Sequence, residues 1–348
     1  MTTRFLITIV SALLAAPSFA EQIKIKGEPR VKTNVRVRHD WSERFQDSRH
    51  GPEVTERFSR TIRIGRTGSF ELANVSGNVT ITGGNGDEVR IDAVKRARSR
   101  DQSNAKALLD ELRIEVTELP NRVEVRTEHP RNRRHYSASV DYTVTVPAGV
   151  DTTIKAVSGD VRVTNVKGEL RAETISGNVV TSGAARLALA KSVSGNVDVT
   201  DATSESALSI STVSGNVTGR GLKARAVEVS SVSGDVIVTN VACDRALVKT
   251  TSGNVDYDGP LARAGRYEVH AHSGNVRLGV TSTTGFELEA TTFNGDVRSD
   301  FPLTLRAGIE GSGSRRGRFN RSIRGSYGDA GAIVTLKSFS GDIVVTKR

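Results

Sequence analysis

The stretch Val227-Glu-Val-Ser-Ser-Val-Ser-Gly-Asp-Val-Ile-Val238 decides the fold of this chain. Val227 and Val229 alternate with polar residues, as in a half-buried β-strand. Val236 and Val238 alternate in the same way but with the opposite parity, so the inward face shifts by one residue between the two runs. The shift falls at Ser233-Gly234-Asp235, where glycine permits a positive φ or a bulge. The stretch therefore predicts two short strands joined at a tight corner.

The corner motif Ser-Gly-Asn/Asp-Val returns at nearly constant spacing along the chain. Its first residues are Ser158, Ser176, Ser194, Ser214, Ser233, Ser252 and Ser273, with steps of 18, 18, 20, 19, 19 and 21 residues. A variant begins at Asn294, and outlying copies begin at Ser76 and Ser340. This period indicates stacked units that pair in parallel, with the valines of each unit, such as Val227, Val232 and Val241, in columns inside.

The predicted fold is all-β: a parallel β-solenoid of about 19-residue coils, with one short helix in an N-terminal capping region. The eight motifs from Gly159 to Gly295 are expected to stack in chain order over about 34 Å, from the spacing of neighbouring strands. The sequence leaves open whether each coil has two faces or more.

The candidate site residues are the structural residues of the predicted corners. Glycine and asparagine both suit tight turns, and each recurs at a fixed position of the motif. A column of Asn and Asp side chains is expected to form a ladder. Stacked carboxylates would suit Ca²⁺, but five of the eight residues in the regular motifs are amides, so a structural ladder is favoured over a metal site. The corner residues are Gly77, Gly159, Gly177, Gly195, Gly215, Gly234, Gly253, Gly274, Gly295, Gly341, Asn178, Asn196, Asn216, Asn254 and Asn275.

The N-terminal part of the chain divides into three predicted segments. Residues 1–20 resemble a secretory signal peptide, with Arg4, an apolar run from Phe5 to Ala16 and small residues before a cleavage site. Residues 21–60 are polar and are predicted to form an arm. Residues 61–150 are predicted to form a β-rich cap with a helix around Leu108, since apolar residues recur there at helical spacing. Residues 151–348 hold the solenoid repeats and a C-terminal cap that ends in a last strand, Ile333 to Val345.

The composition and the targeting signal limit the classes of partner that the protein is expected to bind. The formal net charge is +10, with dense arginine clusters at 131–134 and 315–324. An exported chain is not expected to bind nucleic acid, so an anionic surface glycan or an envelope protein is the expected partner. Cys243, the only cysteine, has no disulfide partner and is expected to be a small buried filler. No membrane-spanning helix is expected in the mature chain. The periplasm is the expected location, with the cell surface or secretion as alternatives.

Three stretches resemble the DUF4097 family, a bacterial family of candidate adhesins with a β-strand repeat. They are Tyr142-Thr-Val-Thr-Val-Pro147, Ile154-Lys-Ala-Val-Ser-Gly-Asp-Val161 and Val334-Thr-Leu-Lys-Ser-Phe-Ser-Gly-Asp-Ile-Val-Val345. The resemblance covers roughly residues 60–348. It implies a parallel β-solenoid and an exported or envelope location, and it carries no catalytic residue over to this chain. The arginine-rich insertion at 311–324 departs from the family pattern.

The sequence contains no common catalytic or phosphate-binding motif. His270 and His272, with Glu268, would share one strand face, but a fourth metal ligand is missing from the pattern, so neither a metal nor another cofactor is expected. A polysaccharide-acting enzyme on a β-solenoid would need a carboxylate pair, and no such pair stands out. The predicted function is therefore a non-enzymatic, exported scaffold, structural or adhesion-like. The alternatives are such an enzyme, or a module that binds a partner or responds to envelope stress.

Overall fold

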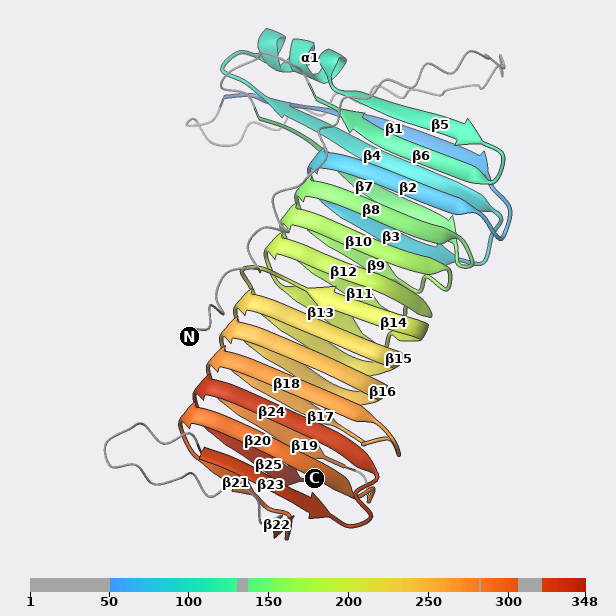
Figure 1. The fold of residues 1–348 in the computed structure, drawn as a ribbon. Coiled ribbons are helices and arrows are strands. Elements are labelled where there is room, and N and C mark those ends of the chain that lie inside the picture. Colours follow the sequence, from blue (N-terminus) through green and yellow to red (C-terminus); the bar gives the residue numbers. More distant parts are fainter. Residues whose placement is uncertain (1–50, 130–136, 282, 306–320) are drawn as a thin grey trace, which may run out of the picture. The chain divides into compact units, whose positions relative to one another are not determined.

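The computed structural model describes residues 51–129, 137–281, 283–305 and 321–348, which belong to one compact unit, Arg36–Arg348. It is all-β with mostly parallel strands in a solenoid-like stack, and one helix lies in the described part of the chain (Figure 1). The all-β prediction and the helix near Leu108 are confirmed: α1 (Gln102–Glu111) buries Ala105, Leu108 and Leu109. The predicted signal peptide, and most of the predicted arm, lie outside the described residues.

Each layer of the stack consists of one strand before a corner and one strand after it, so there are two faces. The strands before the corners are, in stacking order, β2 (Ser69–Ser76), β8 (Asp151–Ser158), β10 (Glu169–Ser176), β12 (Arg186–Ser194), β14 (Thr203–Ser211), β18 (Arg266–Ser273), β24 (Ala332–Ser340) and β20 (Phe286–Asn294). The strands after the corners are β3 (Val79–Gly84), β9 (Val161–Thr164), β11 (Val179–Ser182), β13 (Val197–Thr200), β17 (Val255–Gly259), β19 (Val276–Val280), β25 (Ile343–Lys347) and β21 (Val297–Ser299). Between β14 and β18, the longer β15 (Val217–Ser233) and β16 (Val236–Ser252) each run from one corner to the next.

The interior follows the parity shift of the sequence. Val227 and Val229 are buried before the corner, and Val236 and Val238 are buried after it. Burying one such side chain contributes about 1.5–3 kcal/mol to stability, so the columns of valine, leucine and isoleucine hold the two faces together. Val232 does not belong to these columns: it is 47% exposed, which corrects the expectation that it points inward.

The C-terminal strand pair does not close the end of the stack. β24 pairs in parallel with β18 on one side and with β20 on the other, and β25 lies in the same way between β19 and β21. The motifs at Ser273 and Asn294 are therefore neighbours in the sequence but are separated in space by the motif at Ser340. The prediction that eight motifs stack in chain order, with the last strand as a cap, is wrong at this point.

The N-terminal outlier is also part of the stack. β2 pairs with β8 and β3 pairs with β9, so the corner at Ser76 lies directly beside the corner at Ser158. The chain between them forms an excursion of four strands and the helix. It contains β4 (Glu88–Arg98), β5 (Arg113–Leu119), β6 (Arg122–Glu128) and β7 (Ser137–Pro147).

Antiparallel pairing is confined to the two ends of the described stack. β1 (Glu53–Arg63) pairs with β4, β4 pairs with β7, and β5 pairs with β6. At the other end β23 (Arg321–Tyr327) pairs antiparallel with β20 and with β22 (Thr304–Leu305). β1 begins at Glu53, inside the segment 21–60 that was predicted to be an arm, so regular structure starts earlier than predicted.

Candidate binding surface

The corner glycines form a column in which each glycine lies over the carbonyl of the glycine in the preceding layer. Gly215 has φ of +150°, in a region that side chains disfavour. A Cβ added to it would lie 2.2 Å from the carbonyl oxygen of Gly195. The conformation and the close approach both require glycine. The same close approach, with a Cβ 1.9–2.2 Å from the carbonyl below, is found at Gly159, Gly177, Gly195, Gly234, Gly253, Gly274, Gly341 and Gly295.

The Asn and Asp side chains of the corners form a hydrogen-bonded ladder along the stack. In each layer the side-chain oxygen accepts the backbone N–H of the corresponding residue in the next layer, at 2.7–3.0 Å. An aspartate and an asparagine serve equally as acceptors, which explains why both occur in the motif. The ladder runs through Asn78, Asp160, Asn178, Asn196, Asn216, Asp235, Asn254, Asn275, Asp342 and Asp296.

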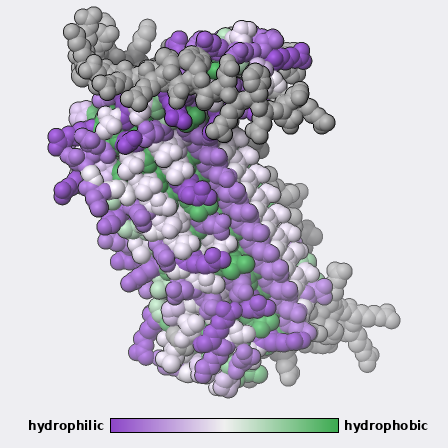
Figure 2. Space-filling view, turned by 180° about the vertical axis from the view of Figure 1, so that it is seen from behind, coloured by the Kyte–Doolittle hydropathy of each residue, from purple (hydrophilic) through white to green (hydrophobic). Residues whose placement is uncertain are grey.

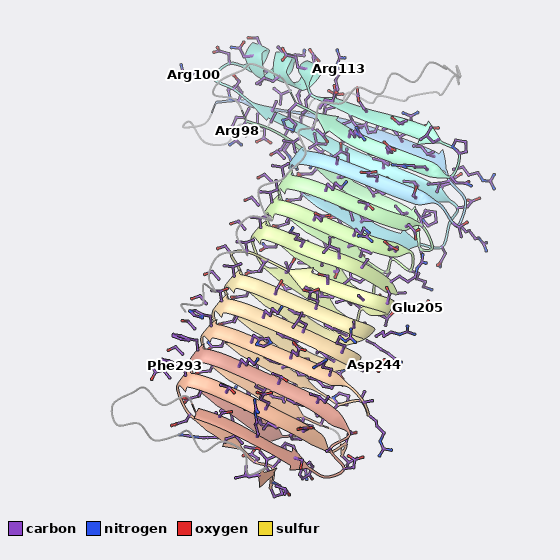
Figure 3. The ribbon with its side chains drawn as sticks, viewed as in Figure 1. Arg98, Arg100, Arg113, Glu205, Asp244 and Phe293 are labelled. Atoms are coloured by element: carbon purple, nitrogen blue, oxygen red, sulfur yellow. The ribbon has the colours of Figure 1, made fainter. Side chains whose placement is uncertain are left out.

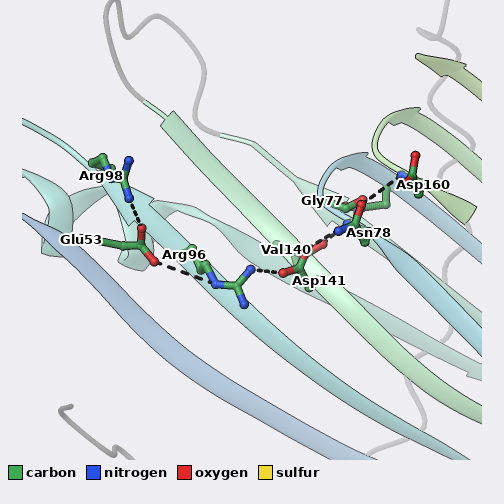
Figure 4. A network of polar contacts seen from close by, with 9 residues as sticks. Glu53, Gly77, Asn78, Arg96, Arg98, Val140, Asp141 and Asp160 are labelled. Atoms are coloured by element: carbon green, nitrogen blue, oxygen red, sulfur yellow. Dashed lines mark hydrogen bonds and ion pairs between the residues drawn. The ribbon is translucent and has the colours of Figure 1, made fainter. Parts of the chain in front are cut away.

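Asp141 begins this ladder, although it comes from β7 and not from a corner motif. Its Oδ1 accepts the backbone N–H of Asn78 at 2.8 Å, and its Oδ2 pairs with Arg96 (Figure 4). Arg96 in turn approaches Glu53, which also pairs with Arg98. An ion-paired carboxylate therefore takes the place of the missing corner residue at this end of the ladder.

A second column, of buried hydroxyl groups, was not predicted from the sequence. A Ser or Thr lies three residues before most corner glycines, and its hydroxyl donates to the carbonyl of the glycine in the preceding layer at 2.8–3.3 Å. The recurrence of Ser or Thr at this fixed offset was the available sequence signal. The hydroxyls belong to Thr174, Ser192, Thr212, Ser231, Thr250, Ser338 and Thr292.

These two columns explain the chemistry of the motif. The peptide group between glycine and Asn/Asp does not take part in the backbone hydrogen bonds between strands. The glycine C=O and the Asn/Asp N–H therefore need other partners. The hydroxyl serves the carbonyl, and the side-chain oxygen of the neighbouring layer serves the N–H. The corner is thus a structural device whose polar groups are used by the fold.

Two layers depart from the hydroxyl column in an informative way. Residue 156 is alanine, and there the amide of Asn74 donates to the carbonyl of Gly77 at 3.0 Å instead. Residue 271 is also alanine, so the carbonyl of Gly253 receives no such hydroxyl. In register with Ala271 are Thr250 on one side and Ser338 on the other.

We expect Ala271→Ser to stabilise the protein by about 1 kcal/mol, because the new hydroxyl completes the column opposite Gly253. The measurement is the midpoint of thermal or urea unfolding. Ala271→Val is the matched control, since it adds volume without a donor and should give no gain. An equal gain in both variants would attribute the effect to apolar burial and contradict the role of the hydroxyl.

The outer side of the corner edge carries an exposed apolar column, two residues before the glycines. Val157 is 45% exposed and Ile175 is 53% exposed, and Val232 and Phe339 lie at the same position in other layers. Directly beside it runs a column of serines, the first residues of the motifs. On the face of the molecule seen in Figure 2, hydrophobic residues form a narrow, broken band among hydrophilic ones.

Towards the C-terminal end this apolar column becomes aromatic. His272 stacks on Phe339, with ring centroids 4.9 Å apart, and Phe339 stacks on Phe293 at 5.0 Å. Figure 3 places Phe293 on the edge of the stack opposite that of Glu205 and Asp244. His270 lies on the same strand as His272, with its Nε2 3.8 Å from a carboxylate oxygen of Glu268.

The remaining sequence candidates do not form a reactive site. Within the described ranges, no three His, Cys, Asp or Glu side chains gather as a metal site, so Glu268, His270 and His272 make no such cluster. Cys243 is buried, and burial raises the pKa of its thiol to about 11. The arginines at 131–134 and 315–318 lie outside the described residues. Nor does any helix in the described part have the length and hydrophobicity needed to span a bilayer.

The solved structures that match this chain share little sequence with it. A candidate adhesin from Bacteroides fragilis has 12% identity and a TM-score of 0.40, covering 84% of this chain and 97% of its own. A candidate lipid-binding protein from Parabacteroides distasonis has 13% identity and a TM-score of 0.40, covering 83% and 96%. A candidate cell adhesion protein from Clostridium sporogenes has 9% identity and a TM-score of 0.25, covering 84% and 100%.

The comparison with curated proteins finds no match. The sequence profile of one family, described as Toastrack DUF4097, matches residues 68–346, which span the corner motifs from Ser76 to Ser340. This match includes the three stretches on which the resemblance was first noted. The chain therefore belongs to the DUF4097 (Toastrack) family.

Proposed function

We propose that this protein is an exported, non-enzymatic binding scaffold of the bacterial envelope, with a structural or adhesion-like role. The observation that supports the proposal is that the inner and outer side chains of the corner edge have different roles. The polar groups of the corner are used to hold the layers together, while serine and mostly apolar side chains face outwards in two neighbouring columns. Such an arrangement presents an extended surface for an extended partner, and among the described residues of this edge we find no activated nucleophile or acid pair.

The finer architecture fits this role. In our proposal each coil is a unit of about 19 residues, and the excursion between β3 and β7 with helix α1 caps one end. The signal-like residues 1–20 support export, with the periplasm as the favoured location. The partner is an envelope protein or an anionic surface glycan, which the positive net charge of +10 would attract.

The test is incubation of the purified mature chain with envelope polysaccharides and peptidoglycan fragments, with both bound material and released products analysed. We expect retention of an envelope component and no new reducing ends or fragments. Turnover of any of these polymers would overturn the proposal in favour of a polysaccharide-acting enzyme. Failure to retain any envelope component would contradict the binding role.

A further inference from the structure

Three basic side chains stand in one row across the sheet near the aromatic end of the corner edge. Lys249 on β16 is the register partner of His270 on β18, and His270 is the register partner of Lys337 on β24. All three point to the outer face, where both lysines are exposed and His270 is half-buried. Across the two strand spacings, the two lysines are about 10 Å apart at the backbone.

The nearby acidic side chains leave the two lysines unpaired. Glu268 pairs with Arg266 at 3.2 Å and with His270, and Glu289 pairs with Arg324. Glu228 is opposite Leu247, not opposite a lysine, and forms no ion pair with a described residue. Lys249 and Lys337 likewise form no ion pair with any residue in the described part of the chain. Burial and the charges of Lys337 and Lys249 lower the pKa of His270, against the opposing effect of Glu268.

The same row has the opposite character elsewhere in the stack. Lys155 on β8 is opposite Glu173 on β10, and Glu173 is opposite Lys191 on β12, so the charges alternate. Like charges directly opposite one another on a sheet are destabilising, while opposite charges contribute favourably. At Lys249 and Lys337, each lysine is instead opposite His270, and no acidic residue stands between the two positive charges. An anionic ligand bound across this row would supply the missing negative charge.

The aromatic rings lie one row nearer the corner, on the same strands. His272 follows His270 by two residues, and Phe339 follows Lys337 by two, so both pairs share the outer face. Phe339 is 50% exposed although it stacks against a ring on each side. The ring edges thus form an apolar wall beside the cations, next to Phe293 at the edge seen in Figure 3.

We propose that Lys249, His270 and Lys337 form a binding site for the anionic groups of an acidic polysaccharide, with the edges of His272 and Phe339 packing against its sugar rings. The site rests on the proposed binding function and gives it a place and a ligand class. Two flexible ammonium groups on either side of an imidazole hold carboxylate or sulfate groups without demanding one fixed geometry. A flat, exposed row suits a polymer that lies across several strands.

The experiment measures binding of polygalacturonate and heparin to the full mature chain by calorimetry, with neutral dextran as the uncharged comparison. Lys249→Gln/Lys337→Gln should weaken binding about tenfold or more, corresponding to at least about 1.4 kcal/mol. Lys155→Gln/Lys191→Gln is the matched control, with the same charge change in the same row, and should weaken binding less than about twofold. All four lysines lie on the outer face, and unchanged melting temperatures would show that both double variants fold.

A second readout is the pKa of His270, followed by NMR with and without polygalacturonate. A bound anion favours the imidazolium form, so the pKa should rise on binding. Equal losses in the two double variants would reduce the effect to net charge and overturn the site. Binding to vesicles of anionic phospholipid in place of either polysaccharide would also overturn it. If the Lys249→Gln/Lys337→Gln variant still binds envelope material like the wild type, only this site fails, whereas failure of the wild type itself contradicts the proposed function.

Discussion

Gly215→Val should destabilise the protein by about 3 kcal/mol or more, whereas Asn216→Asp should leave its stability nearly unchanged. The valine would need a positive φ that β-branched residues resist. Its Cβ would also lie 2.2 Å from the Gly195 carbonyl oxygen, so two layers of the stack would have to move apart. Asn216→Asp keeps the side-chain oxygen that accepts the backbone N–H of Asp235.

The measurement is urea unfolding followed by circular dichroism, with the soluble yield recorded so that a failure of the valine variant to fold is detected. Gly215→Ala gives a graded control that keeps the conformational and steric conflict of the Cβ but lacks both γ-methyl groups of valine. We expect the order Asn216→Asp, Gly215→Ala, Gly215→Val in increasing loss of stability. Equal unfolding midpoints for Gly215→Val and Asn216→Asp would contradict the corner geometry.

Alkaline pH should destabilise the fold steeply, because the folded protein buries several weakly acidic side chains in their neutral form. Tyr267 donates its hydroxyl to the Cys243 carbonyl at 2.7 Å, and the Tyr257 hydroxyl is 3.6 Å from the Cys243 thiol. Burial raises the pKa of Tyr267 to about 12, that of Tyr142 to about 12 and that of Cys243 to about 11. It also raises the pKa of Tyr257 well above its usual value.

The sign of the effect follows from which state loses its protons first. In the unfolded chain the thiol titrates near 9 and the tyrosines near 10, so above these values the folded state holds more protons and stability falls with pH. The stabilisation is complete below pH 9 and is lost up to about pH 12. For Tyr142 alone, the rise of its pKa from 10.0 to about 12 on folding corresponds to a loss of about 3 kcal/mol of folding free energy at high pH.

The measurement is the unfolding free energy between pH 8 and 12, with tyrosinate absorbance recorded in parallel. Tyr257→Phe is the informative variant, because it removes one buried acid and only a weak contact with the thiol. Its stability should fall less steeply above pH 10 than that of the wild type. Parallel curves for the two proteins would mean that Tyr257 does not resist ionisation in the folded state.

Much of this architecture could be predicted from local pattern. The opposite parity of Val229 and Val236 implies a corner, and the recurring Gly234 and Asp235 show how that corner is made. The ladder of Asn and Asp side chains follows from the same repeat. The buried hydroxyls, such as Thr250, were equally regular in the sequence. Their role was hidden because only the stacked layers place them under a glycine carbonyl.

Which face a side chain occupies near the corner was harder to predict. Val232 has the same parity as Val236 and Val238, which are buried. It nevertheless points outwards, because the change of inward parity occurs after it, at the corner glycine. The candidate polysaccharide site depends on the order of the layers. Lys249, His270 and Lys337 each lie three residues before a corner motif, so the repeat places Lys249 beside His270. Only the tertiary structure, which puts β24 next to β18, brings Lys337 into the same row.

By itself, then, the amino-acid sequence determined the strands, the corners and the presence of a stack, because these depend on residue alternation and on glycine at fixed intervals. Only the tertiary structure decided the order of the layers. Every corner offers its neighbour the same glycine carbonyl and the same side-chain oxygen, so local chemistry does not distinguish one neighbour from another. The connections after β3 and after β21 let the chain leave the stack and return, and long-range packing places β24 between β18 and β20.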